Sequence, residues 1–188
     1  MPSSVAVLPT EIPGVLEIRA QVFEDDRGFF TETYSKAIWG LEGFTEDFVQ
    51  DNLSFSNKGV MRGLHYQILP HGMGKLIRVL TGAAFDVIVD LRRGSPTHGR
   101  WMGRRLQEDT PLWLWVPVGF AHGFLALSDN TRVYYKCTGS HNAGAERSLR
   151  YNDPALGIEW PAPVEIISQK DADAPLFKDC EYNFNYEG

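Results

Sequence analysis

The sequence predicts an all-β protein built as an antiparallel sandwich or barrel. Short runs of alternating apolar and polar residues follow one another along the chain, and glycine, proline, asparagine and aspartate separate them. Two of these runs, Val60 to Gln67 and Phe120 to Leu127, carry His65 and His122 where a strand ordinarily carries packing residues. Histidine exchanges protons near neutral pH, so two of them on strands indicate a site inside a barrel. Each histidine taken alone also fits a hydrogen-bonded core residue.

Size and composition are those of one globular domain spanning residues 1–188. With 43% hydrophobic and 22% charged residues, the chain can bury a sizeable core. A net charge of −6 argues against a nucleic-acid or membrane partner, although a single nucleotide needs only a few arginines and lysines. Glu11 and prolines interrupt the beginning of the chain where a signal segment would lie, and no apolar run reaches the ~20 residues of a membrane span. We therefore expect a cytoplasmic protein. The two cysteines, Cys137 and Cys180, show no metal or redox spacing.

Turn residues between apolar runs predict two hairpins in the first half of the chain. The pairs are Val15 to Val22 with Phe29 to Tyr34, around Asp25-Asp26-Arg27-Gly28, and Lys75 to Leu80 with Ala84 to Leu91, around Thr81-Gly82-Ala83.

The remaining elements are mostly single strands. Ser35 is a suitable N-cap for a short helix from Ser35 to Leu41. The last forty residues, rich in proline and acidic groups, predict irregular structure and a short helix wrapped on the barrel. Further strands are expected at Phe48 to Ser54, Val60 to Gln67, Trp101 to Leu106, Leu112 to Val116, Phe120 to Leu127 and Thr131 to Thr138.

Strand alternation separates two adjacent tyrosines. In the run Thr131 to Thr138, Tyr134 shares a face with two charged residues, whereas Tyr135 shares the other face with Val133 and Cys137. We expect Tyr135 to point inward. On spacing alone it also fits a core tyrosine bonded to a backbone carbonyl.

Two further features of the strands need an explanation. Asp86 and Asp90 lie on one face of a Val/Ile-rich run, and a buried aspartate needs a cationic partner, for which Lys75 is the candidate. Arg62 and His65 are three residues apart, so a regular strand would place them on opposite faces. Both can line one site only if Gly63 carries a β-bulge.

In their order and distances, these motifs resemble the nucleotide-sugar epimerase family whose type member is dTDP-4-dehydrorhamnose 3,5-epimerase. The resemblance covers nearly the whole chain, and the ordered set is far more specific than any single motif. Its carriers are Asp26-Arg27-Gly28-Phe29-Phe30, Gln50-Asp51-Asn52, Arg62-Gly63-Leu64-His65, Gly74-Lys75-Leu76, Phe85-Asp86-Val87, Gly119 to Phe124, Tyr135-Lys136, Asn152-Asp153-Pro154, Gly157 to Pro161 and Ser168-Gln169-Lys170-Asp171.

The resemblance implies a cupin-like antiparallel jelly-roll barrel, a homodimer, and an active site in the lumen. It implies that the enzyme epimerises a dTDP-linked 4-keto-6-deoxy sugar on the path to rhamnose, with neither a cofactor nor a metal. His65 resembles the general base, Asp171 the carboxylate that orients it, and Tyr135 the acid on the opposite side of the sugar. Substrate-contacting positions of the family match Arg27, Glu32, Gln50, Asp51, Asn52, Arg62, Lys75, His122, Glu146 and Lys170.

The reaction itself requires these residue types. Epimerisation next to a ketone removes a carbon-bound proton, holds an enolate, and returns a proton to the other face. A histidine paired with a carboxylate is a suitable base, and a lysine near the keto oxygen stabilises the enolate. Arginines such as Arg27 and Arg62 offer the forked donors that diphosphates prefer.

Simpler roles exist for several of these residues. Ser168-Gln169-Lys170-Asp171 is also a capping box in front of a short helix. Arg27 fits an exposed turn residue, and Glu146 and Lys170 fit solvated loop residues.

Other functions remain open. Pro117 to His122 matches half of a metal-dependent cupin motif, but His65 lacks the second histidine of a His-x-His pair. A non-catalytic sugar-nucleotide binding barrel would not need His65 and Tyr135 together. A single-carbon epimerase is a further alternative, because Ser140-His141 stands where many family members have two tyrosines.

Overall fold

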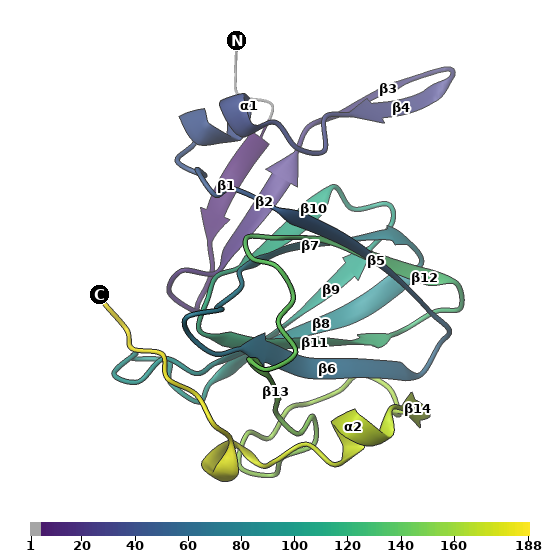
Figure 1. Ribbon diagram of the computed structural model, residues 1–188. Helices are drawn as coiled ribbons and strands as arrows, with labels where there is room; N and C mark the ends of the chain where they lie inside the picture. Colours follow the sequence, from purple (N-terminus) through teal and green to yellow (C-terminus); the bar gives the residue numbers. More distant parts are fainter. Residues whose placement is uncertain (1–4) are drawn as a thin grey trace.

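The computed structural model describes residues 5–188 and consists mainly of β-strands in two sheets (Figure 1). The first sheet contains β1 (Val5–Pro9), β2 (Leu16–Ala20), β5 (Gln50–Ser56), β7 (Lys75–Thr81), β10 (Leu112–Val116) and β12 (Thr131–Cys137). The second contains β6 (Val60–Gln67), β8 (Ala83–Asp90), β9 (Trp101–Gln107), β11 (Phe120–Ala126), β13 (Glu146–Ser148) and β14 (Ile166–Ile167). A hairpin of β3 (Val22–Asp25) and β4 (Gly28–Thr31) stands apart, and the helices are α1 (Lys36–Leu41), α2 (Gln169–Ala172) and the 3-10 turn η1 (Phe177–Asp179).

The two sheets face each other as an antiparallel barrel, which confirms the predicted fold class. Strands follow the order β1-β2-β10-β7-β12-β5 in the first sheet and β13-β6-β11-β8-β9 in the second. All of these neighbours are antiparallel, and only the short β14 joins β6 in parallel.

The turn of the first predicted hairpin is correct but its first strand is not, and the second hairpin is wrong. β3 and β4 pair around Asp25 and Gly28, whereas most of the predicted strand Val15 to Val22 is β2, which pairs with β1 and β10. β7 instead pairs with β10 and β12, whereas β8 pairs with β9 and β11. The turn at Gly82 therefore carries the chain from one sheet to the other, because turn residues reverse a chain without choosing the partner of the next strand.

An apolar core fills part of the space between the sheets. Ile77 and Val133 from the first sheet meet Ile88 and Phe124 from the second, each at most 4% exposed. Tyr135 packs against this core. Because Phe124 and Tyr135 also line a cavity, the polar site begins where the apolar core ends.

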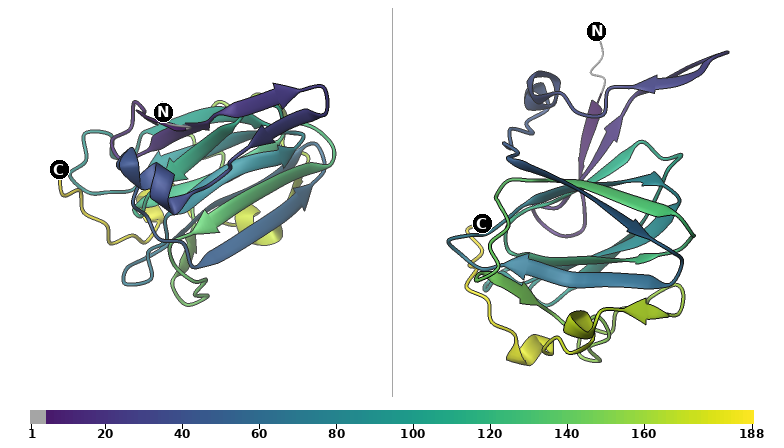
Figure 2. Two further views of the ribbon diagram at one scale, coloured as in Figure 1. Left: turned by 90° about the horizontal axis from the view of Figure 1, so that it is seen from above. Right: turned by 45° about the vertical axis from the view of Figure 1, so that its right-hand side comes forward.

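The outer faces of both sheets are partly covered. α1 places the buried Trp39 against Trp113 of the first sheet, and Ser35 caps this helix by accepting the N–H of Ile38, as predicted. The segment after β13 covers the second sheet, so the predicted wrapping of the last forty residues is confirmed (Figure 2). No helix within residues 5–188 is long and apolar enough to cross a membrane.

Candidate active site

A cavity of about 540 Å³ opens between the two sheets, and a second space of about 260 Å³ lies beside it. We refer to these as the larger lobe and the smaller lobe. His65, Lys75 and Tyr135 belong to the walls of both lobes. These three side chains therefore stand at the junction, where one ligand group can contact all of them.

A bulge in β6 brings Arg62 and His65 to the same cavity. The register with β11 pairs His65 with His122 but Arg62 with Phe124, so β6 contains one extra residue. Gly63 has a φ of +105°, and a Cβ atom there would lie 2.7 Å from the Cα of Gly123. The predicted bulge is confirmed, and the backbone of β11 approaches so closely that only glycine fits.

His65 is bonded to a carboxylate that is itself held in place. The distance between His65 Nε2 and Asp171 Oδ1 is 2.6 Å, and Asp171 Oδ2 accepts the N–H of Gly63 at 3.2 Å. The parallel pairing of β14 with the start of β6 positions α2 and Asp171 at this point of the strand. Burial opposes ionisation of Asp171, but the bonds from His65, Gly63 and Ser168 lower its pKa, which favours a carboxylate.

The capping role and the histidine-orienting role of Asp171 coexist. Ser168 Oγ accepts the backbone N–H of Asp171 at 3.2 Å and caps α2. The cap bonds the backbone N–H of Asp171, while its two carboxylate oxygens contact His65 and Gly63.

Tyr135 lies on the first sheet, whereas His65 lies on the second, and both line the same two lobes. Burial raises the pKa of Tyr135, so its hydroxyl keeps its proton at neutral pH. The neighbouring Tyr134 points to the outer face and donates to Asp51 Oδ2 at 2.9 Å. The predicted orientation of both tyrosines is confirmed.

Asp86 is not bonded directly to Lys75, the cationic partner that we expected, although its charge still favours the protonated form of Lys75. His122 Nε2 lies 2.8 Å from Asp86 Oδ2. Asp90, in the same strand as Asp86, forms an ion pair with Arg92. Lys75 instead points to the junction and donates to the carbonyl oxygen of His65 at 3.5 Å. Burial lowers the pKa of Lys75 and of His122, which weakens the hold of both side chains on their protons. The pair was missed because Asp86 faces Phe124 in the register, so its contact with His122 is diagonal.

Comparison with known proteins identifies the family. The family model described as dTDP-4-dehydrorhamnose 3,5-epimerase matches residues 9–179. The chain belongs to this family. It is similar to the dTDP-4-dehydrorhamnose 3,5-epimerase of Shigella flexneri, with 44% identity over 94% of this chain and 98% of that one.

Two solved structures of the epimerase family resemble the fold closely. The enzyme from Legionella pneumophila, in complex with dTDP-4-keto-L-rhamnose, has a TM-score of 0.86 and 44% identity over 93% of this chain and 94% of that one. The enzyme from Bacillus anthracis, with TDP and PPi bound, has a TM-score of 0.89 and 44% identity over 92% of this chain and 99% of that one.

The structure groups most of the residues expected from the epimerase family. Gln50, Asn52 and Glu146 line the smaller lobe. The larger lobe is lined by Arg62, Lys75, His122 and Lys170.

Three expected substrate contacts lie elsewhere. Asp51 is on the outer face, bonded to Tyr134 and Lys136, which corrects its grouping with Gln50 and Asn52. The side chain of Arg27 is 89% exposed and paired with Asp25, and Glu32 is exposed just after the same hairpin, which projects from the barrel (Figure 1). Neither Arg27 nor Glu32 lines a lobe of its own chain.

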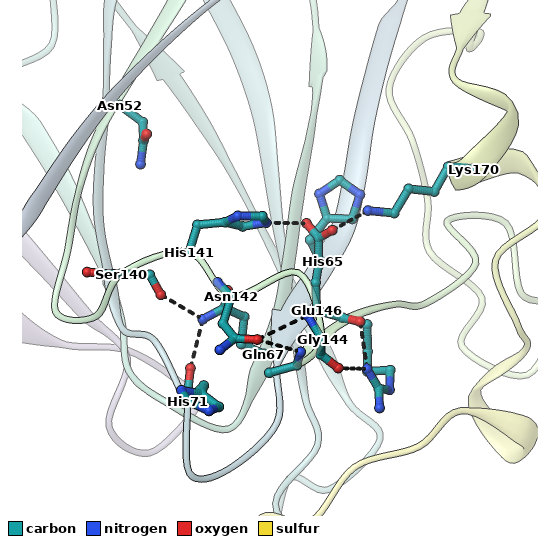
Figure 3. A network of polar contacts seen from close by, with 12 residues as sticks. Asn52, His65, Gln67, His71, Ser140, His141, Asn142, Gly144, Glu146 and Lys170 are labelled. Carbon is teal, nitrogen blue, oxygen red and sulfur yellow. Dashed lines mark hydrogen bonds and ion pairs between the residues drawn. The ribbon is translucent and has the colours of Figure 1, made fainter.

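Gln67 is a site residue that the sequence-based set lacks. It is 6% exposed, and its amide nitrogen donates to the carbonyl oxygens of His71 and Ser140 at 2.8 and 3.3 Å (Figure 3). Its amide oxygen accepts the N–H of Asn142 at 2.7 Å. Gln67 thus fixes two loops at the rim of the smaller lobe. Its position two residues after His65, on the same strand face, is the signal that would have found it.

The metal-dependent cupin alternative lacks a suitable group of metal-binding side chains in the described part of the chain. Within residues 5–188, no three His, Cys, Asp or Glu side chains are grouped so that they could hold a metal ion. His65 and His122 each have Nε2 in contact with a carboxylate.

Proposed function

We propose that this protein is an isomerase that converts dTDP-4-dehydro-6-deoxy-D-glucose into dTDP-4-dehydro-L-rhamnose by epimerising carbons 3 and 5. One observation carries the proposal: a carboxylate-bonded histidine and a protonated tyrosine enter the same cavity from opposite sheets. Inversion at carbon needs a base on one face of the ring and an acid on the other. The dTDP-linked sugar in the Legionella relative, and membership of the epimerase family, support the substrate.

In this mechanism His65 is the base. Its Nε2 contacts Asp171, so Nδ1 takes the proton from the carbon next to the ketone while the C–H electrons move into an enolate. The lowered pKa of Asp171 keeps an anion beside the imidazolium that forms. Asp171 therefore both orients the ring and stabilises its charge.

The enolate and its reprotonation involve the other junction residues. Lys75 lines the larger lobe and supplies a donor for the developing negative charge on oxygen. The Tyr135 hydroxyl then delivers a proton to the opposite face of the carbon, and solvent restores both groups. A second round at the other carbon completes the conversion.

Cationic side chains in the larger lobe suit the diphosphate. Arg62, Lys75 and Lys170 all line it, whereas its only carboxylate, Asp171, already contacts His65 and Gly63. Arg62 is held by Ser56 Oγ and the carbonyl oxygen of Phe55, each at 3.0 Å. This arrangement favours binding of a dianionic group.

The β3–β4 hairpin supports a homodimer. Phe29 and Phe30 at its tip are 70% and 68% exposed, beside Arg27. Adjacent exposed aromatics are typical of a surface that a partner covers. A second copy that receives this hairpin gives Arg27 and Glu32 a substrate-contacting role that they lack within one chain. We further propose a cytoplasmic enzyme, and the net charge of −6 argues against nucleic acid or membrane as a partner.

Solvent exchange tests the reaction directly. The purified protein is incubated with dTDP-4-keto-6-deoxyglucose in D₂O, and NMR follows deuterium at carbons 3 and 5. Exchange and inversion at both carbons are expected. Exchange at one carbon only would identify a single-carbon epimerase, and exchange at neither would refute the proposal.

A further inference from the structure

Glu146 lies between the ammonium of Lys170 and the imidazole of His141 at the rim of the smaller lobe (Figure 3). Its Oε2 contacts the ammonium of Lys170, and its Oε1 lies 3.8 Å from His141 Nε2. The Glu146 side chain is 24% exposed, whereas those of His141 and Lys170 are 55% and 57% exposed. The carboxylate is therefore the more buried member, and its two partners are the more exposed ones.

The position of His141 is set by its loop. The backbone N–H of His141 donates to Gln50 Oε1 at 3.1 Å, and Gln67 holds both neighbouring residues, Ser140 and Asn142. These bonds attach the loop to β5 and β6 on either side of the smaller lobe. The bonds of the loop thus hold the imidazole of His141 beside Glu146 at the rim.

Lys170 can also pair with a second anion, one bound in the larger lobe. Its side chain lines the larger lobe together with Arg62 and Lys75, where the diphosphate is proposed to bind. Glu146 does not line that lobe but the adjacent one. An ammonium on a long, half-exposed side chain can exchange one anion for another at little cost, because each exposed pair is worth only about 0.2–1 kcal/mol.

We propose that Lys170 leaves Glu146 for the substrate's diphosphate on binding, and that His141 keeps Glu146 paired when it does. Lys170 and His141, which face different oxygens of Glu146, then both influence the affinity for the diphosphate. Without the His141 imidazole, Glu146 would have one neighbouring hydrogen-bond donor fewer once Lys170 departs, and Lys170 would be retained more tightly. This inference rests on the proposed function for the identity of the anion, and it assigns His141 a role at the rim of the smaller lobe.

Calorimetric titration of the full chain with inorganic pyrophosphate, and separately with dTDP, tests the exchange. Glu146→Gln should tighten binding about 1.5- to 5-fold, because Lys170 no longer has to leave a carboxylate. Lys170→Met should weaken binding about tenfold or more, the effect of losing one charged donor to a phosphate. His141→Asn should weaken it by a smaller factor, about twofold.

Two double variants make the test specific. In the Lys170→Met background, Glu146→Gln should lose most of its tightening effect, and in the Glu146→Gln background, His141→Asn should have none. Lys178→Met and His71→Asn replace exposed residues whose side chains line neither lobe, and they serve as matched controls without effect.

The outcomes separate the alternatives. Glu146→Gln could tighten ligand binding equally in the presence of Lys170 and in the Lys170→Met background. This result would mean that the Glu146 carboxylate simply repels the ligand, and it would overturn the exchange. A His141→Asn effect that survives in Glu146→Gln would overturn the part assigned to His141. Absence of pyrophosphate and dTDP binding by every form would overturn the whole inference. Because the measurement needs no turnover, an inactive protein with the expected binding cycle would refute the proposed reaction alone.

Discussion

The lumen contains two histidine–aspartate pairs that differ in their surroundings. His65 on β6 and His122 on β11 are direct partners in the register, and their Nε2 atoms lie 2.6 and 2.8 Å from Asp171 and Asp86. The His65 side chain is 30% exposed, and the second oxygen of Asp171 accepts the N–H of Gly63. The His122 side chain is 8% exposed, and the second oxygen of Asp86 is buried without a hydrogen-bond partner.

These surroundings suit different tasks. A fully bonded carboxylate beside a partly exposed ring supports a histidine that gains and loses a charge in each cycle. Burial lowers the pKa of His122, so this ring stays neutral near pH 7, and with its Nε2–H given to Asp86 its Nδ1 can accept a hydrogen bond from a sugar hydroxyl. A short histidine–aspartate distance alone therefore does not identify a base. The protonation states that the surroundings permit decide the role.

The largest expected difference between the pairs is in proton abstraction. His65→Ala should reduce solvent exchange at both carbons by about 10²–10⁴-fold, the usual contribution of a general base. His122→Ala should reduce it less, because the base remains. Single-turnover deuterium incorporation measures both variants. An equal or larger loss in His122→Ala would reverse the two roles.

Removing the phenol of Tyr135 tests whether the acid lies across the lumen from His65. Tyr135→Phe should abolish net inversion while exchange at the first carbon survives, because proton removal still uses His65. Chiral analysis of the product, together with NMR of the exchanged positions, distinguishes the two steps. Tyr134→Phe, which removes a hydroxyl on the outer face, is the matched control and should be nearly silent. Unchanged stereochemistry in Tyr135→Phe would remove the assignment of Tyr135 as the acid.

A third comparison concerns the two aspartates. Asp171→Asn should slow exchange by up to about 10²-fold, the cost of misplacing a reacting group by an ångström, and thus less than His65→Ala. Asp86→Asn should have a weaker effect, since His122 is not the base. The two rates are compared at saturating substrate. A greater loss in Asp86→Asn would contradict the assignment of Asp171 as the orienting group.

The features predicted correctly from sequence are those that local geometry determines. Strand alternation placed Tyr135 inside and Tyr134 outside because successive side chains must point to opposite faces. The need for a bulge at Gly63 followed from the three-residue spacing of Arg62 and His65. The Ser168 cap was readable for the same reason, since it involves residues close in sequence.

The features that were wrong or missing depend on distant parts of the chain. The partners of β7 and β8 are chosen by burial and register across the barrel, which the turn at Gly82 does not encode. The contact between Asp86 and His122 arises from the pairing of β8 with β11. Within one chain, Arg27 stands apart from the site that its motif predicted, because the hairpin that carries it projects from the barrel.

Acid should affect stability through both pairs, in different pH ranges. The pKa of His122 is lowered in the fold, so the unfolded chain binds this proton more readily and stability is lost as pH falls below about 6.5. The pKa of Asp171 is also lowered, and its contribution is lost only below about pH 4. The melting temperature should therefore fall by a few °C between pH 7.5 and 5.5, at about 2–4 °C per kcal/mol for a chain of this size.

Variants identify the source of this change. His122→Gln should flatten the dependence between pH 7.5 and 5.5, even if its stability is lower throughout, whereas the exposed His71→Gln should leave the slope unchanged. Asp171→Asn should retain the slope in that range and flatten it only at lower pH. Thermal unfolding followed by circular dichroism measures all of these forms. An unchanged slope in His122→Gln would contradict a neutral, buried His122.

The smallest expected effect is that of metal removal, and it tests whether the two pairs act as proton-transfer groups or as ligands. A metal-dependent cupin requires a His-x-His pair, but Tyr66 and Gln67 follow His65. Proton abstraction and enolate stabilisation need only the side chains at the junction. Dialysis against a strong chelator should leave the rate of solvent exchange within about twofold, a change that corresponds to less than 1 kcal/mol in the barrier. Loss of exchange that a divalent ion restores would instead make His65 and His122 metal ligands, and the contrast between their carboxylates would then reflect coordination.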